Sequence, residues 1–117
     1  MSNAVVFDFD GVIHSYVSGW QGMTVITDPP VNGIREAIAD IRRAGYEVIV
    51  VSARCADQDG LKAVEEYLER NDIKVHRVCK EKPQAKVYID DRALHFDGHA
   101  ETLLEKIDIF TTWREQA

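Results

Sequence analysis

Short apolar runs, separated by polar segments with helical periodicity, make up most of this chain. Residues 4–7 and residues 48–51 are uninterrupted apolar runs. Runs of this kind are typical of central parallel strands that are buried on both faces. Between them, apolar residues recur at helical spacing at Ile34, Ala37, Ile38 and Ile41. This spacing predicts a helix that Asn32 caps and that Gly45 ends.

The second half of the chain repeats this alternation. Either Asp57 or Asp59 is expected to cap a second helix that ends near Asn71. Its apolar stripe runs through Leu61, Val64, Tyr67 and Leu68. Alternating residues 73–78 predict a strand nearer the edge of the sheet, and residues 86–89 predict a further strand.

Two segments are less regular. Residues 12–30 mix β-prone pieces with glycines and aromatic residues, which indicates a short flap or hairpin beside the first strand. Residues 94–96 predict a weak strand, followed by a turn and a last helix that carries Leu103, Leu104 and Ile107. The aromatic residues Phe110 and Trp113 are expected to pack on the core or to contact a partner, and packing is favoured.

The order of these elements predicts the fold class. Strands that alternate with helices over residues 1–117 indicate a single α/β domain, with a parallel sheet and helices on both faces. In this three-layer α/β/α, Rossmann-like arrangement, ligands bind outside the carboxyl ends of the central strands. The residues expected at that edge are Asp8, Asp10, Ser52, Arg54, Asp90 and Asp91.

Acids follow the first and the last of the main predicted strands. Asp8 and Asp10 stand two positions apart at the end of the first strand, and Asp90 and Asp91 follow residues 86–89. Crowded carboxylates need a shared proton or a cation, and their hard oxygen atoms suit Mg²⁺. We therefore expect Asp8, Asp90 and Asp91 to supply carboxylate ligands at a magnesium site, to which Asp10 could add its backbone carbonyl.

The same residues supply the parts that phosphoryl transfer requires. Asp8 is expected to attack phosphorus and form an aspartyl-phosphate. Asp10 is expected to protonate the leaving oxygen and then to deprotonate water. Ser52 could donate its hydroxyl to a phosphate oxygen, and Arg54 could grip a phosphate through its planar fork. Lys82 is expected to supply positive charge on the side of the phosphate opposite the metal, and Lys80 and Lys86 are the alternatives.

This arrangement resembles the haloacid dehalogenase (HAD) superfamily, whose members are mostly phosphatases with an Asp-x-Asp-Gly loop. The resemblance extends over about residues 5–96 and rests on Asp8-Phe9-Asp10-Gly11-Val12, Ser52-Ala53-Arg54, Lys82 and Ile89-Asp90-Asp91-Arg92. It implies a HAD-like fold and a magnesium-dependent hydrolase of phosphoric monoesters, in which Asp91 binds the metal directly, binds it through water or orients its neighbour. The acid two positions after the nucleophile disfavours carbon–halogen cleavage, because the dehalogenase branch lacks it.

The resemblance also suggests how the substrate binds. The expected contacts are Gly11, Ser52, Ala53, Arg54 and Lys82, together with His14 on the flap. The segments in which a cap domain would sit are too short for one, so an open site is expected. Its substrate would be a phosphorylated small molecule or the phosphorylated end of a polymer, and a second copy of the chain could cover it.

Three alternatives remain. The Asp-Asp-Arg sequence is similar to the phosphatase domains of polynucleotide kinases, which favours a polynucleotide or nucleotide end-phosphatase. A receiver-like phosphoacceptor domain would also place acids around magnesium, although its accepting aspartate would follow the third strand, where Cys79 stands. A binding domain without activity would keep the fold but would tolerate loss of Asp10 or Lys82.

Composition and charge restrict the classes of partner and the compartment that are expected for this protein. The net charge of −6 makes a nucleic-acid duplex a poor partner unless a local basic patch outweighs it. The sequence has no apolar stretch of bilayer length and no signal-peptide pattern, which predicts a cytoplasmic protein without membrane contact. Cys55 and Cys79 lack the spacing of a zinc site and are expected to be reduced thiols.

Overall fold

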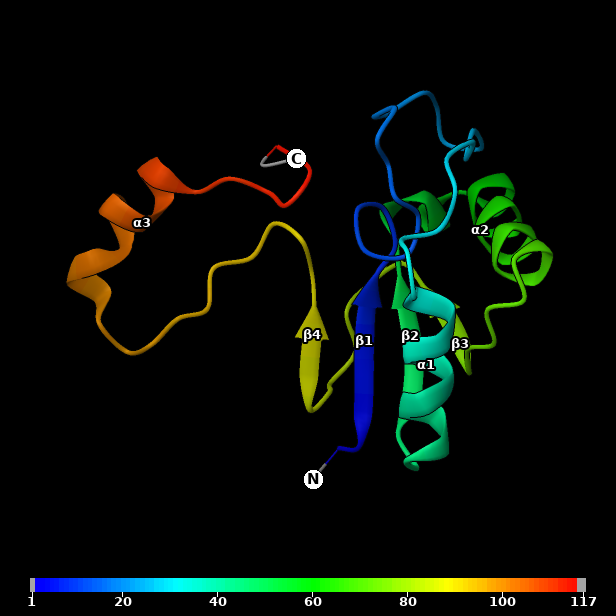
Figure 1. Ribbon diagram of the computed structural model, residues 1–117, viewed down its shortest axis with the longest axis horizontal. Helices are drawn as coiled ribbons and strands as arrows, with labels where there is room; N and C mark the ends of the chain where they lie inside the picture. The colour runs from blue at the N-terminus through cyan, green and yellow to red at the C-terminus, as the bar shows by residue number, and fades with distance from the viewer. Residues whose placement is uncertain (1, 116–117) are drawn as a thin grey trace.

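The computed structural model describes residues 2–115, and its centre is one sheet of four parallel strands in the order β3-β2-β1-β4 (Figure 1). The strands are β1 (Ala4–Asp8), β2 (Glu47–Val51), β3 (Arg77–Cys79) and β4 (Val87–Ile89). This arrangement confirms the α/β class, the central position of the two apolar runs and the edge position of the third strand.

Three α-helices and two short 3₁₀ turns connect or follow the strands. They are α1 (Ile34–Arg43), η1 (Ala53–Ala56), α2 (Gln58–Arg70), η2 (Ala100–Thr102) and α3 (Leu103–Ile109). Asp57 caps α2 by accepting a hydrogen bond from the Asp59 amide, as predicted. The predicted Asn32 cap is wrong, because the chain enters α1 through Gly33 at a φ of 81° without a side-chain cap.

Helices α1 and α2 cover the same face of the sheet. The core between them contains alternate residues of the central strands, including Phe7 and Val50, packed with Ile38 of α1 and Val64 of α2. Both crossovers are made in the same direction along the sheet, and right-handed crossovers then place their helices on one face. This core anchors β1 and β2, whose carboxyl ends carry the candidate site.

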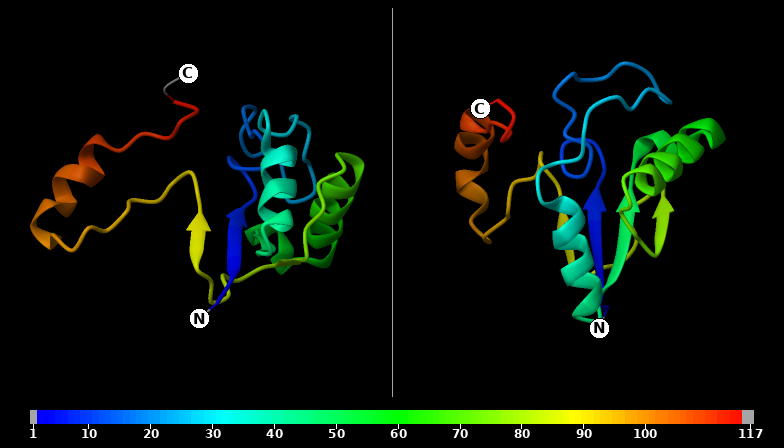
Figure 2. Two further views of the ribbon diagram at one scale, coloured as in Figure 1. Left: turned by 60° about the horizontal axis from the view of Figure 1, so that its bottom comes forward. Right: turned by 45° about the vertical axis from the view of Figure 1, so that its right-hand side comes forward.

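The opposite face of the sheet is crossed by the connection between β3 and β4. Ala4, Val6, Ile49 and Val51 are buried there, and Ala85 of the connection packs against them. Helix α3 stands apart from the sheet in both views of Figure 2, and none of its residues is buried. A complete third layer of helices therefore stays a prediction.

Two predicted strands and the predicted flap differ from the observed structure. Ile73 is buried, and its amide bonds to the Leu68 carbonyl at the end of α2, so the edge strand begins only at Arg77. The structure assigns no strand within residues 94–96, which lie beyond β4, the last strand of the sheet. The flap has isolated bridges at His14 rather than a hairpin.

Two other properties of the chain follow from the described residues. Both cysteines are free, in agreement with the predicted thiols. Among the helices within residues 2–115, none combines the length and the apolar character that crossing a membrane requires.

Candidate active site

The carboxyl ends of two strands bring the predicted acids to one edge of the sheet, at the top of Figure 1. Asp8 is the last residue of β1, and Asp90 and Asp91 directly follow β4, which pairs with β1. One carboxylate oxygen of each of these three acids lies within 4.8 Å of the others. Strand pairing therefore joins acids that are far apart in the sequence.

This acid cluster, Asp8, Asp90 and Asp91, is electrostatically crowded. Burial, followed by the charges of Asp90 and Asp91, raises the pKa of Asp8 to about 7. The Asp91 side chain is only 2% exposed, and its Oδ1 atom has no hydrogen-bond partner. Three hard oxygen donors with an unpartnered buried oxygen fit a divalent cation such as Mg²⁺.

The Asp10 side chain is held outside this cluster. Its Oδ1 atom lies 2.8 Å from His14 Nδ1, and its Oδ2 atom accepts a 2.9 Å hydrogen bond from Arg54 Nε. Burial alone would raise the pKa of Asp10, but the hydrogen bonds from His14 and Arg54 outweigh burial and lower it. The Asp10 carboxylate is thus committed to these two residues and stands apart from the acid cluster.

His14 lies behind Asp10 and is almost completely buried. Its Nε2 atom accepts a 3.2 Å hydrogen bond from the Asp28 amide, so the ring proton resides on Nδ1 and is donated to Asp10. The ring stacks on Phe9 and meets the edge of Tyr67. His14, predicted to contact substrate, is thus buried behind Asp10 and orients its carboxylate.

Arg54 is also buried, with only 1% of its side chain exposed. Besides Asp10, its guanidinium binds the flap: Nη1 donates to the carbonyls of Gly22 at 2.7 Å and Met23 at 2.8 Å. The Trp20 ring covers it at 4.6 Å. Arg54 was predicted to bind a phosphate, but its guanidinium is not exposed. Arg54 connects the flap to Asp10.

The remaining predicted residues lie around the same edge. Ser52 follows β2, is buried, and accepts a 3.2 Å hydrogen bond from the Arg54 amide, which caps η1. Lys82 Nζ lies 3.6 Å from Asp90 Oδ2. Of the three candidate lysines, Lys82 is the one with a described ion pair to the acid cluster.

A small cavity of about 150 Å³ opens between the first and second strands and the flap. Its lining includes both predicted catalytic acids, and comprises Asp8, Asp10, Tyr16, Trp20, Ser52, Ala53, Arg92 and Arg114. Arg114 belongs to no predicted motif. The sequence offered no signal for it, because the C-terminal residues reach the site only through the tertiary fold.

Gly11 adapts the backbone to the acid cluster. It has a φ of 89°, and a Cβ atom at this position would overlap the Asp91 carboxylate. Its carbonyl accepts a 2.7 Å hydrogen bond from the indole Nε1 of Trp113. Gly11, which was predicted to contact substrate, is approached by the Asp91 carboxylate and by Trp113.

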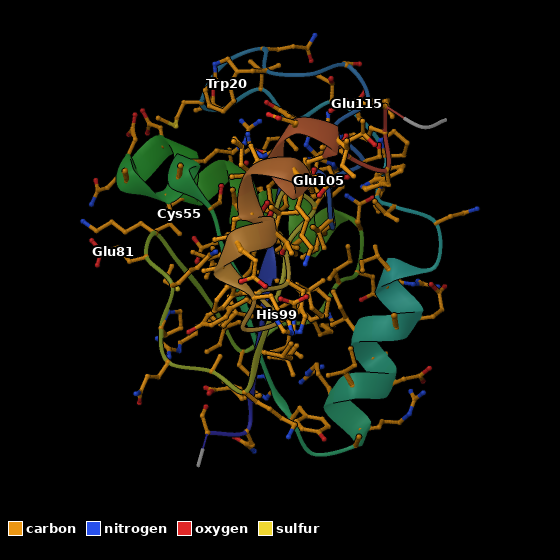
Figure 3. All side chains as sticks on the ribbon, turned by 90° about the vertical axis from the view of Figure 1, so that its left-hand side faces the viewer. Trp20, Cys55, Glu81, His99, Glu105 and Glu115 are labelled. Carbon is orange, nitrogen blue, oxygen red and sulfur yellow. The ribbon has the colours of Figure 1, made fainter. Side chains whose placement is uncertain are left out.

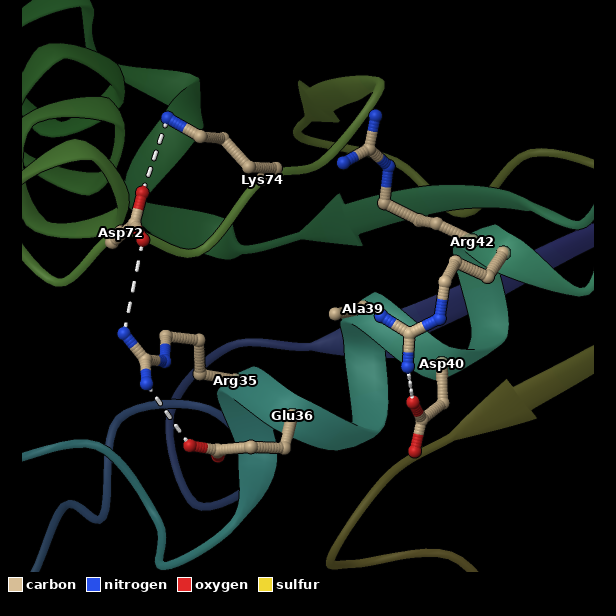
Figure 4. A pocket seen from close by; sticks show the side chains of 8 residues that line it. Arg35, Glu36, Ala39, Asp40, Arg42, Asp72 and Lys74 are labelled. Carbon is tan, nitrogen blue, oxygen red and sulfur yellow. Dashed lines mark hydrogen bonds and ion pairs between the residues drawn. The ribbon is translucent and has the colours of Figure 1, made fainter.

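A second hollow lies between α1 and residues 72–74 (Figure 4). It is lined by charged residues that pair with one another, as Arg35 does with Glu36 and Asp72, and Lys74 with Asp72. Exposed pairs of this kind are ordinary surface features. Neither predicted catalytic acid lies in it.

Comparison with known proteins adds no family to this picture. No protein-family model matches the sequence, and no curated protein gives a significant match.

Proposed function

We propose that the chain is a HAD-type, magnesium-dependent phosphatase that hydrolyses phosphoric monoesters through an aspartyl-phosphate on Asp8. The observation that carries this proposal is the separation of two neighbouring acids into different environments. Asp8 lies in the acid cluster with a raised pKa, whereas Asp10 is held by His14 and Arg54 with a lowered pKa. Asp8 thus faces a cluster that fits a cation, which would keep its carboxylate ionised as a nucleophile, whereas Asp10 is held apart as the proton carrier.

Asp8, Asp90 and Asp91 would hold the cation. When bound, Mg²⁺ would neutralise charge on the acids and on the phosphoryl oxygens. Lys82, next to Asp90, would add positive charge at the border of the cluster. The proposal extends to a complete HAD-like three-layer fold without a cap domain.

In the first step, a carboxylate oxygen of Asp8 attacks phosphorus. The new Asp8–phosphorus bond forms as the bond from phosphorus to the leaving oxygen breaks, and Asp10 gives its proton to that oxygen. In the second step, Asp10 takes a proton from water. The resulting hydroxide attacks phosphorus, which breaks the bond to Asp8 and releases inorganic phosphate.

The charge state of Asp10 in the ligand-free protein suits the second step. Its lowered pKa keeps it as a carboxylate, the form that accepts a proton from water. The first step needs the protonated form. A dianionic phosphoryl group beside Asp10 raises the pKa of its carboxyl, since like charges disfavour ionisation, so substrate binding itself would promote protonation.

Phosphate release from an aryl phosphate tests this proposal. Turnover should require Mg²⁺, stop with a chelator and be lost in Asp8→Asn and Asp10→Asn. Asp40→Asn, an exposed change on α1, serves as the matched control and should retain full activity. Absence of release from a broad panel of phosphate esters, or undiminished release by Asp8→Asn, would contradict the proposal. A stable phosphoprotein formed from acetyl phosphate without turnover would favour a phosphoacceptor instead.

A further inference from the structure

The C-terminal strap, residues 110–115, returns to the candidate site from the far end of α3. The red strap lies beside the blue flap in Figure 1, and Figure 3 shows Glu115 and Trp20 at the same end of the molecule. Thr112 of the strap is buried, and the Trp113 indole donates a hydrogen bond to the Gly11 carbonyl. The strap is therefore attached to the loop that carries Asp10.

Arg114 is the residue of the strap that reaches the cavity. Its Nη1 atom donates to the Tyr16 carbonyl at 3.2 Å, and its Nη2 atom lies 3.4 Å from Asp91 Oδ2. The guanidinium also lies over the Tyr16 ring at 4.8 Å, which fixes its plane. Its Nε atom is buried without a hydrogen-bond partner, although the side chain as a whole is 23% exposed. A guanidinium has five N–H donors, so Arg114 is oriented but keeps donors for a ligand.

The other cations near the site are less suited to this cavity. Arg54 is buried behind Asp10, and its guanidinium is occupied by the carboxylate and the flap carbonyls. Lys82 lies beside Asp90 and is not among the residues that line the cavity. The cationic residues that line the cavity are Arg92 and Arg114, and Asp8 and Ser52 line it as well.

We propose that Arg114 binds the phosphoryl oxygens of the substrate, with Arg92 as its partner, and that the strap thereby covers the site from within the same chain. That the bound phosphoryl group belongs to a substrate rests on the proposed function. The anion site itself does not depend on it. Its ligand is a phosphate dianion, which the planar fork of a guanidinium binds through two parallel hydrogen bonds. Such a cover would take the place of a separate cap domain.

Binding of inorganic phosphate to the full chain in the presence of Mg²⁺ tests the inference by calorimetry. Arg114→Ala should weaken binding by about 10-fold to 100-fold, the range expected when hydrogen bonds to a charged group are lost. Arg114→Lys should lie between this variant and the wild type. The matched control is Arg35→Ala, which removes the same charge from the exposed face of α1 and should bind phosphate as the wild type does. Equal affinity in Arg114→Ala and the wild type would overturn the inference.

A second measurement follows phosphate binding in the wild-type protein and uses a conservative variant only to assign the signal. The Nε–H signal of Arg114 in the NMR spectrum, assigned by its loss in Arg114→Lys, should shift when phosphate is added to the wild type. An unchanged Arg114 signal while the Phe9 amide shifts would mean that phosphate binds next to Asp8 without Arg114, and would refute the inference.

The two proposals fail in different ways. If phosphate binds through Arg114 but no ester is hydrolysed, the phosphatase proposal falls and the anion site stands. If esters are hydrolysed and Arg114→Ala changes neither KM nor phosphate affinity, the anion site falls and the phosphatase stands.

Discussion

The guanidinium of Arg54 binds both carboxylate oxygens of Asp10, with Nε 2.9 Å from Oδ2 and Nη2 3.3 Å from Oδ1. A buried arginine that is fully occupied in this way cannot release its partner without leaving a charge unpaired. Asp10 is thus fixed relative to the flap, whose carbonyls bind the same guanidinium.

Removal of this arginine should destabilise the protein. Arg54→Ala leaves the Asp10 carboxylate and three flap carbonyls without their donor, and we expect the free energy of unfolding to fall by about 3 kcal/mol. Urea denaturation measures this change. Arg35→Ala, which breaks only exposed ion pairs, should cost less than about 0.5 kcal/mol. Equal losses of unfolding free energy in the two variants would show that the buried Arg54–Asp10 pair stabilises the fold no more than an exposed ion pair does.

Gly11→Ala should disturb the acid cluster. The new Cβ would overlap the Asp91 carboxylate, and the φ of 89° disfavours any side chain, so we expect a loss of about 2 kcal/mol and weaker cation binding. The shift of the melting temperature with added Mg²⁺ reports the second effect. Gly19→Ala is the control, because its φ is 73° but nothing lies within 4 Å of a Cβ there. It should share the strain and keep the response to Mg²⁺.

The raised pKa of Asp8 predicts how stability depends on pH without a cation. The folded state holds the Asp8 proton up to about pH 7, whereas the unfolded chain releases it near the ordinary value of 3.8. The contribution of this group to the free energy of unfolding therefore declines as the pH rises between these values, and it is lowest above about 7.

Melting temperatures of the wild type and Asp8→Asn across this range measure the effect. The variant should lack the decline and gain on the order of 1 kcal/mol over the wild type at high pH, once solvent screening of this partly exposed group is allowed for. Added Mg²⁺ should restore the wild type above pH 7, because it binds the folded state. Parallel pH profiles for both proteins would refute the assignment of the raised pKa to Asp8.

Ser52 has two roles that a pair of variants can separate. Ser52→Ala removes the cap of η1 and should cost about 1 kcal/mol. It also removes a hydroxyl from the cavity, so phosphatase activity should fall by about 10-fold. Asp57→Ala removes the cap of α2, outside the cavity, at a similar cost in stability. If both variants lose activity equally, the effect comes from stability rather than from a lost contact to phosphate.

Local patterns in the sequence predicted much of the fold. The apolar runs of β1 and β2 and the stripes of α1 and α2 depend on periodicity, which a sequence displays directly. The grouping of Asp8 with Asp90 and Asp91 also followed, because carboxyl ends of parallel strands share one edge. Position along a strand was enough to place these acids.

The direction of the longer side chains could not be predicted. Arg54 follows β2 beside Ser52, yet it turns inward to Asp10 because the flap supplies carbonyls that only the tertiary fold brings there. His14 likewise stands four residues after Asp10 and was expected to contact substrate, whereas it is buried and accepts a hydrogen bond from the Asp28 amide. Arg114 depends on the course of the whole C-terminal segment, which no local pattern encodes.

The pairing of β1 with β4 has a consequence for the order of assembly. These are the first and the last strands of the chain, and their register aligns Phe7 with Ile89, next to the acids. Closing so long a loop is the slow, entropically costly part of folding, whereas β1 and β2 can pair around α1 much earlier. A chain that has formed β1, β2 and β3 would still lack two of its three clustered acids. Cation binding is therefore expected to appear only when the last strand has docked, which makes it a signal that the sheet is complete.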